Sequence, residues 1–205
     1  PDHLSSLAKL AAMTGCDLGR YADFLDALRQ RRTAFRNAGA TATDHDVPNL
    51  ATCWLDRDRI EALHSRAVTG TLCADEARAY YGHMLVEMAQ MAAEDGMVMQ
   101  IHAGSRRNTN APLFASHGPD MGADIPGAIN WVDGMAALLN RVGNDPRLRV
   151  ILFTLDESAY SRELAPMAGH WPCLRIGPPW WFHDSLNGMR RYFDRVVETA
   201  GYLNL

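Results

Sequence analysis

The chain has 205 residues, a length that corresponds to one domain or to a large part of one. Hydrophobic residues make up 47% and charged residues 21%, which indicates a globular fold and excludes global disorder. The net charge of -4 excludes the basic surface that binds a nucleic acid backbone, and no apolar run is long enough to span a membrane. These two features predict neither a nucleic acid partner nor a membrane partner. Because no secretory signal opens the sequence, we expect a cytoplasmic protein.

Lysine and cysteine usage narrows the possible enzyme classes. Lys9 is the only lysine among 20 basic residues. A P-loop needs a Gly-Lys pair, and Schiff-base or pyridoxal-phosphate chemistry needs a lysine in a pocket, so neither class is expected. The four cysteines show no Cys-x-x-Cys spacing, which argues against a zinc ribbon or a thioredoxin motif.

The first half of the sequence is predicted to be mostly helical. Apolar residues at helical spacing predict helices at residues 3–14, 18–37, 56–68 and 74–95. Between the second and third of these, residues 40–43 are small and predict a short buried strand. Asp44 and His45 are then expected at the C-terminal tip of that strand.

The second half of the sequence alternates between strands and helices. Apolar runs predict buried strands at residues 97–102, 150–155 and 173–177. Helices are predicted between and after them, at residues 129–142, 157–167 and 185–200. Such alternation indicates βαβ units and a parallel sheet, so the predicted fold class is α/β with four strand–helix repeats.

Polar and aromatic residues gather at the predicted strand ends, where parallel sheets bind their ligands. They are Asp44, His45, His102, Arg106, Arg107, Asn108, Asp156, Trp180, Trp181, His183 and Asp184. Histidine, carboxylate, arginine and tryptophan side chains together suit an anionic, polyhydroxylated small molecule, with or without a divalent metal.

Several of these residues, and Arg31 on a predicted helix, also have a purely structural interpretation. His102 could be a hydrogen-bonded histidine that lines a loop, and Asp44 could cap the next turn. The Trp180–Trp181 pair could be a packed wedge or the apolar wall of a sugar site. Arg31, on a predicted helix, is typical of a solvated surface charge. The residues alone leave these alternatives open.

Five stretches in sequence order resemble the uronate isomerase (glucuronate isomerase) family of the amidohydrolase superfamily. They are Arg31–Gly39 (RRTAFRNAG), Thr43–His45 (TDH), Met99–Gly104 (MQIHAG) with Arg107 and Asn108, Gly118–Asp120 (GPD) and Trp180–Asp184 (WWFHD). Two positions depart from the family pattern. His183 replaces the usual Asn before the last Asp, and Asp46 replaces the Gly after the Asp-His pair.

The resemblance implies a (β/α)8 TIM-barrel fold, of which this sequence would cover about strands 4 to 7 and a helical insertion. Residues 1–39 would form helices leading into the barrel, 40–47 a barrel strand, 48–96 a helical segment and 97–205 three further β/α units. The family's His-x-His of the first strand does not occur in this sequence, and the family's Asp-x-Arg does not follow its last predicted strand. An internal portion with about half of the barrel is therefore expected.

The resemblance also implies an activity, an intramolecular oxidoreduction between aldose and ketose uronic acids. D-glucuronate would be interconverted with D-fructuronate, and D-galacturonate with D-tagaturonate, by metal-assisted proton transfer through a cis-enediol. The implied cofactor is a divalent metal, expected to be zinc, and a homo-oligomer that binds a small uronic acid is expected. The alternatives are an amidohydrolase-type metal hydrolase and a non-catalytic sugar-acid-binding fragment.

The resemblance assigns roles residue by residue. The implied catalytic residues are Asp44, His45 and His102. The implied substrate-binding residues are Arg31, Arg107, Asn108, Trp180 and Trp181. Arg31 would bind the substrate carboxylate, and His102 is the one expected metal ligand, since the main ligands are expected outside this sequence.

Overall fold

The computed structural model describes residues 3–204. Its α-helices are α1 (His3–Thr14), α2 (Tyr21–Asn37), α3 (Arg57–Ala67), α4 (Ala74–Asp95), α5 (Ala111–His117), α6 (Trp131–Val142), α7 (Ala165–His170) and α8 (Leu186–Ala200). A π-helical turn, η1 (Tyr160–Leu164), leads into α7, and a 3-10 turn, η2 (Tyr202–Asn204), follows α8. The strands are β1 (Ala42–Val47), β2 (Val98–Ala103), β3 (Ser105–Arg106), β4 (Ile125–Pro126), β5 (Val150–Thr154) and β6 (Leu174–Ile176).

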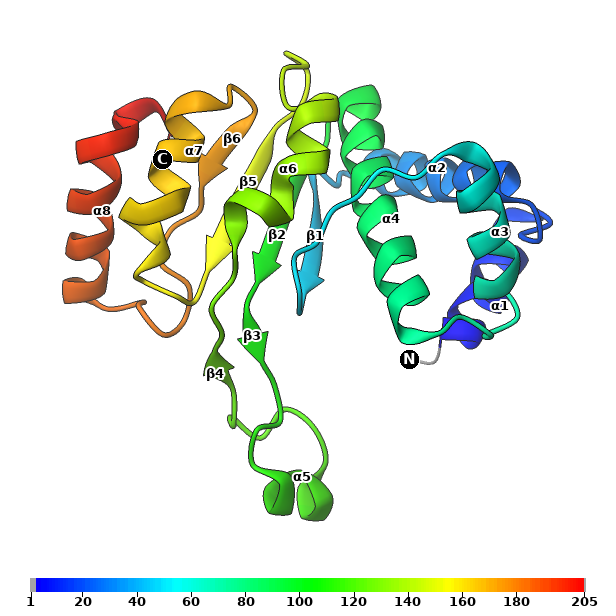
Figure 1. The fold of residues 1–205 in the computed structure, drawn as a ribbon, viewed down its shortest axis with the longest axis horizontal. Coiled ribbons are helices and arrows are strands. Elements are labelled where there is room, and N and C mark those ends of the chain that lie inside the picture. The colour runs from blue at the N-terminus through cyan, green and yellow to red at the C-terminus, as the bar shows by residue number, and fades with distance from the viewer. Residues whose placement is uncertain (1–2, 205) are drawn as a thin grey trace.

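A four-stranded sheet in the order β1-β2-β5-β6 organises the molecule (Figure 1). All three strand pairs are parallel, and helices connect successive strands. The predicted α/β class with a parallel sheet and four strand–helix repeats is thereby confirmed. In this part of the chain, none of the helices is both long enough and apolar enough to cross a membrane.

The two faces of the sheet differ in burial because side chains alternate along each strand. One face is fully buried and carries Met99, Ile101, Val150 and Leu152, which form the main core with side chains of α4, α6, α7 and α8. The opposite face carries Gln100, His102, Ile151 and Phe153, which are only half-buried. We call this second face the open face.

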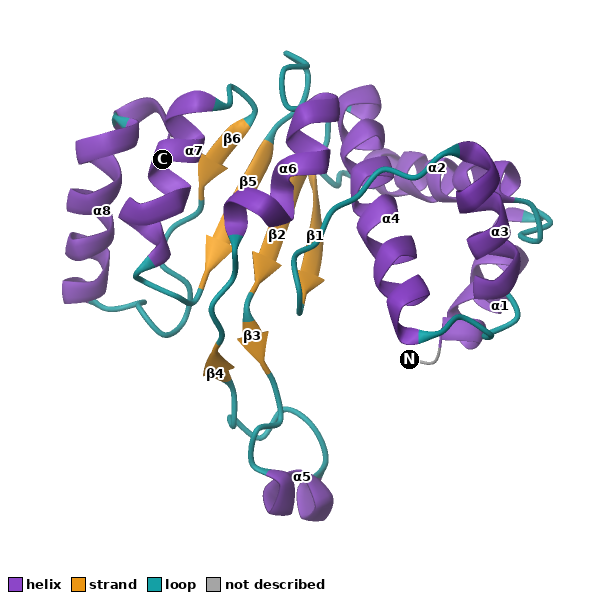
Figure 2. Ribbon diagram, in the orientation of Figure 1, coloured by secondary structure: helices purple, strands orange, loops and turns teal. Residues whose placement is uncertain are grey.

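Helices α1, α2 and α3 pack beside α4 at the β1 side of the sheet (Figure 2). They form two small apolar clusters, one around Phe24 and one around Leu63. The buried His64 imidazole joins them, since it bonds Tyr80 Oη and the Leu18 carbonyl, each at 2.8 Å. Hydrogen bonds on both ring nitrogens offset the cost of burying this side chain.

Strand β1 corrects one expectation. It covers Ala42–Val47 rather than residues 40–43, so Asp44 and His45 lie inside the strand and not at its tip. The cause is pairing with β2, which places Asp44 opposite Gln100. This ladder outweighs the low strand propensity of aspartate.

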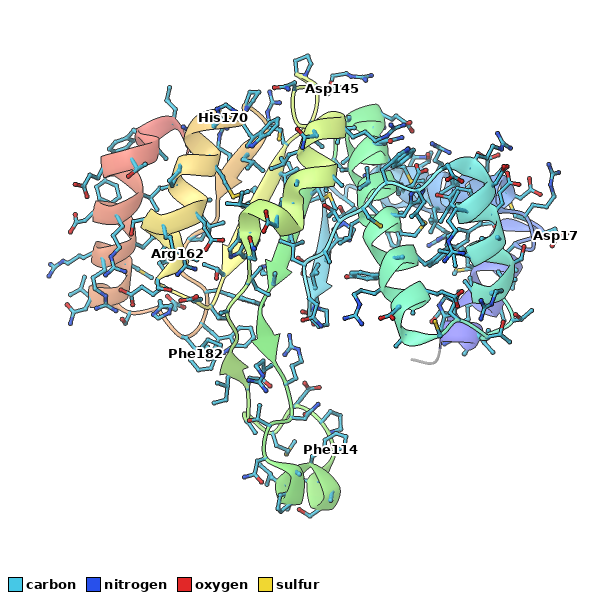
Figure 3. The ribbon with its side chains drawn as sticks, viewed as in Figure 1. Asp17, Phe114, Asp145, Arg162, His170 and Phe182 are labelled. Atoms are coloured by element: carbon cyan, nitrogen blue, oxygen red, sulfur yellow. The ribbon has the colours of Figure 1, made fainter. Side chains whose placement is uncertain are left out.

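An arm that was not predicted projects from the carboxyl end of β2 (Figure 1). Its base is the antiparallel pair β3–β4, and its tip is α5, where Phe114 is labelled (Figure 3). Asn110 caps α5 by accepting a hydrogen bond from the Leu113 amide. Asn108 and Asp120, with φ of 55° and 63°, adopt the left-handed conformation within the arm.

Candidate functional site at the sheet edge

His102 lies near the end of β2, on the open face. Its Nδ1 donates a hydrogen bond to Asp44 Oδ1 on β1 at 2.5 Å. Since a carboxylate only accepts, the proton lies on Nδ1, and Nε2 is the atom left to meet a ligand. The imidazole is 13% exposed, whereas the Asp44 carboxylate is 67% exposed. The structure therefore brings together two of the three predicted catalytic residues.

Aromatic side chains surround this imidazole. The Phe153 ring of β5 stacks on it with a centroid distance of 4.3 Å and an interplanar angle of 17°. Trp180, in the loop after β6, lies 4.4 Å away at 46°. Trp181 packs edge-on against Trp180 at 4.3 Å and is more exposed. The tryptophan pair thus reaches the open face beside His102.

Arg107, at the base of the arm, connects three segments. Its guanidinium donates from Nε to Asp46 at 3.3 Å and from Nη1 to Asp124 at 3.1 Å. Its Cζ lies 5.7 Å from the Trp181 ring centroid. Two carboxylates already neutralise this arginine, so a substrate carboxylate would have to share it.

His45 has different neighbours from Asp44. Because strand side chains alternate, His45 points to the opposite face, where Nε2 lies 3.1 Å from Thr43 Oγ1. Burial and the nearby Arg32 charge lower the pKa of His45 to about 4, so the ring is neutral at physiological pH. The structure does not bring His45 to His102.

Arg31, on α2, also lies apart from His102. It lines a pocket of about 430 Å³ beside β1, together with Asp44 and His45. Its guanidinium sits 4.9 Å from the Phe35 ring centroid. A cation over an apolar wall is a suitable receptor for a carboxylate, but this pocket is centred on β1 rather than on the tryptophan pair.

The sequence analysis did not identify three residues as part of this site: Asp46 and Asp124, which bond Arg107, and Phe153, which stacks on His102. Each is identified only by strand register or by the return of the arm, which join segments distant in sequence. Other predicted strand-end residues have structural partners. His183 bonds the Leu155 carbonyl and pairs with Glu157, and Asp156 caps the turn at Ser158.

Within residues 3–204, no group of three or more His, Cys, Asp or Glu side chains could hold a metal ion. His102 nevertheless fits a single ligand position. A metal-bound histidine usually donates its other ring N–H to a carboxylate, which is the arrangement of His102 with Asp44. The described residues thus offer one ligand with its orienting partner.

The fold and this site define an α/β protein with a carboxylate-held histidine, arginine and tryptophan at the carboxyl edge of a parallel sheet. A family model, glucuronate isomerase, matches residues 2–203, and the chain belongs to that family. A uronate isomerase of Rhizorhabdus wittichii is 56% identical over 201 residues, which is 98% of this chain and 43% of the relative.

Solved structures agree with this assignment. The glucuronate isomerase of Caulobacter crescentus superposes with a TM-score of 0.91 at 51% identity, over 96% of this chain and 41% of that one. The uronate isomerase of Thermotoga maritima gives a TM-score of 0.88 at 29% identity, over 97% of this chain and 44% of that one. The chain therefore spans less than half the length of these relatives.

Proposed function

We propose that this chain forms part of an isomerase that interconverts aldose and ketose uronic acids, D-glucuronate with D-fructuronate and D-galacturonate with D-tagaturonate. The observation that carries the proposal is the Asp44–His102 pair at the sheet edge, in a chain of the glucuronate isomerase family. A homo-oligomeric enzyme of the amidohydrolase superfamily belongs to the same proposal and rests on the family resemblance, and a cytoplasmic location is proposed with it.

We further propose that the sheet is about half of a (β/α)8 barrel, its strands 4 to 7. All four strands are parallel, and their buried face packs against helices, as in the outer ring of such a barrel. The open face would then be the barrel interior. Residues 1–39 would lead into the barrel, 40–47 and 97–205 would supply its strands, and 48–96 would form the helical insertion.

The proposed reaction moves one proton between C2 and C1 of the open-chain sugar acid and a second proton between the C2 and C1 oxygens, through a cis-enediol. His102, with Nδ1 bound to Asp44, presents Nε2 as an acceptor to the substrate or as a ligand to a metal. Trp180 and Trp181 would line the sugar, and Arg107 with Asn108 would contact it from the base of the arm. Arg31 would bind the substrate carboxylate.

A catalytic role for His45 remains a prediction. Its imidazole lies on the face of β1 opposite to His102. We propose a divalent metal, expected to be zinc, with His102 as the ligand from this chain and the remaining ligands from elsewhere. When bound, the metal would act as a Lewis acid on the substrate oxygens.

The test is His102→Asn in the intact protein. We expect turnover of D-glucuronate to fall about a hundredfold or more, since general acid–base and metal-centre residues contribute on this scale. The thermal midpoint should stay close to wild type, because His102 lies outside the main apolar core. Wild-type turnover with normal metal content would dismiss the role of His102.

A further inference from the structure

Four residues form a row across the open face, one from each strand or its end. Asp46 of β1 pairs with His102 of β2, and His102 pairs with Phe153 of β5. Gly177 follows β6 directly and lies beside Phe153, since Leu152 pairs with Ile176. The row therefore runs from the edge strand β1 to the edge strand β6 through His102.

The Phe153 ring lies where any side chain on Gly177 would have to be. A Cβ built on Gly177 would lie 2.3 Å from Cε1 and 2.4 Å from Cδ1 of Phe153. Carbon atoms in real structures do not approach this closely, so any larger residue at this position must displace the ring. The need for glycine here is steric.

Phe153 in turn defines the plane of the His102 imidazole. The two rings are 4.3 Å apart and nearly parallel, at 17°. The hydrogen bond from Nδ1 to Asp44 fixes how the imidazole is rotated within its plane, but a single bond does not fix the tilt of that plane. The stacked ring supplies the second constraint, and together they set the direction of Nε2.

We propose that Phe153 and Gly177 are positioning residues for His102. Gly177 leaves room for the Phe153 ring, and that ring fixes the tilt of the His102 imidazole. The inference rests on the proposed isomerase function of His102. Phe153 suits this role better than one in general packing, because it lies half-buried on the open face and outside the main apolar core. Both residues act through His102.

The experiment compares four variants of the intact protein, Gly177→Ala, Phe153→Leu, the double variant and Gly169→Ala. The last is the matched control, since a Cβ on Gly169 would meet its nearest atoms at ordinary distances of 3.7 and 3.8 Å. Steady-state kinetics with D-glucuronate gives kcat and KM. Crystal structures of the variants give the Nδ1–Oδ1 separation and the tilt of the His102 ring.

We expect Gly177→Ala to lower kcat about tenfold or more with KM changed less than about twofold, because a displaced reacting group impairs the chemical step more than binding. The His102 ring should be tilted in that crystal structure. Phe153→Leu should lower kcat similarly. The double variant should be no slower than Phe153→Leu alone, since the ring that the added Cβ strikes is gone.

The proposal is overturned if Gly177→Ala matches Gly169→Ala in kcat, or if His102 keeps its tilt and its Asp44 bond in both single variants. It is also overturned if Gly177→Ala lowers kcat further in the Phe153→Leu background. Should Gly177→Ala fail to fold, Phe153→Leu alone decides between these outcomes. A wild-type protein that isomerises no uronate would refute the proposed function, while the ring geometry would still test positioning.

Discussion

Asp44 and His45 are neighbours on β1 but lie in different surroundings, because successive side chains of a strand point to opposite faces of the sheet. Asp44 accepts a hydrogen bond from His102 on the open face. His45 faces α2, where burial and the Arg32 charge lower its pKa to about 4. An Asp-His pair read from sequence looks like one functional unit, but its two members serve different sides of the sheet.

Arg31 is expected to act through the planar geometry of its guanidinium and not through its charge alone. Its guanidinium has no ion-pair partner among the salt bridges of residues 3–204 and lines the pocket beside β1. Arg31→Lys keeps the charge but loses the planar fork that grips a carboxylate, so we expect kcat/KM for D-glucuronate to fall about tenfold. Arg36→Lys, an exposed change on the same helix, is the control. A loss below about threefold, well under 1 kcal/mol, would remove Arg31 from the substrate site.

Some helices and strands could be predicted from the sequence and others could not. The predicted bounds of α4 are those observed, because Glu76 bonds the Cys73 amide at its start and Gly96, with φ of 76°, ends it in the left-handed conformation. The β3–β4 arm was missed, since each of its strands has two residues and no periodicity. His102 and Asp44 were found from strand order, whereas Phe153 required the register between strands.

The segment between β1 and α3 packs closely against glycines of α4 and α6. A Cβ on Gly82 of α4 would lie 2.2 Å from the Ala51 carbonyl oxygen, and one on Gly134 of α6 would lie 2.6 Å from that of Leu50. Alanine normally stabilises an open helix position by up to about 1 kcal/mol. We expect the reverse here, a loss of about 1–3 kcal/mol in the free energy of unfolding for either Gly→Ala variant, from denaturant titration. Gly169→Ala should be unchanged or more stable, and equal behaviour of all three would refute close packing.

The packing of helices α1, α2 and α3 beside α4 should also lose stability in acid, because burial lowers the pKa of His64 below its ordinary value of 6.5. The unfolded chain therefore binds a proton below about pH 6.5 that the folded His64 does not, and stability falls as the pH drops below that value, by at most about 1.4 kcal/mol per pH unit for one proton. Denaturant titrations at pH 7.5 and 5.5 should show a smaller difference in His64→Gln than in wild type. An identical difference would exclude His64.

The sheet has helices on its buried face, an open face, and β1 and β6 as its edge strands among residues 3–204 (Figure 1). Parallel sheets are normally covered on both faces. The relatives are more than twice as long as this chain, which covers 43% of the Rhizorhabdus wittichii protein. In the proposed barrel, further strands paired with the edges at β1 and β6 would enclose Gln100 and Ile151 and bring more polar side chains to His102.

The 205-residue chain by itself should be catalytically incomplete. A catalytic zinc usually takes three protein ligands, and no group of three candidate ligands lies within residues 3–204, where His102 is the one proposed ligand. We therefore expect the purified chain to bind zinc weakly and to convert no D-glucuronate, with zinc or manganese added. Isothermal titration with zinc and an assay for the ketouronate measure the two expectations, and His102→Asn in the same chain reports the contribution of this one ligand. Because four strands cannot close a barrel, the chain should also associate through its free edges, which sedimentation would detect. Stoichiometric tight zinc together with turnover would mean that the complete site lies within these residues and that the half-barrel proposal is wrong.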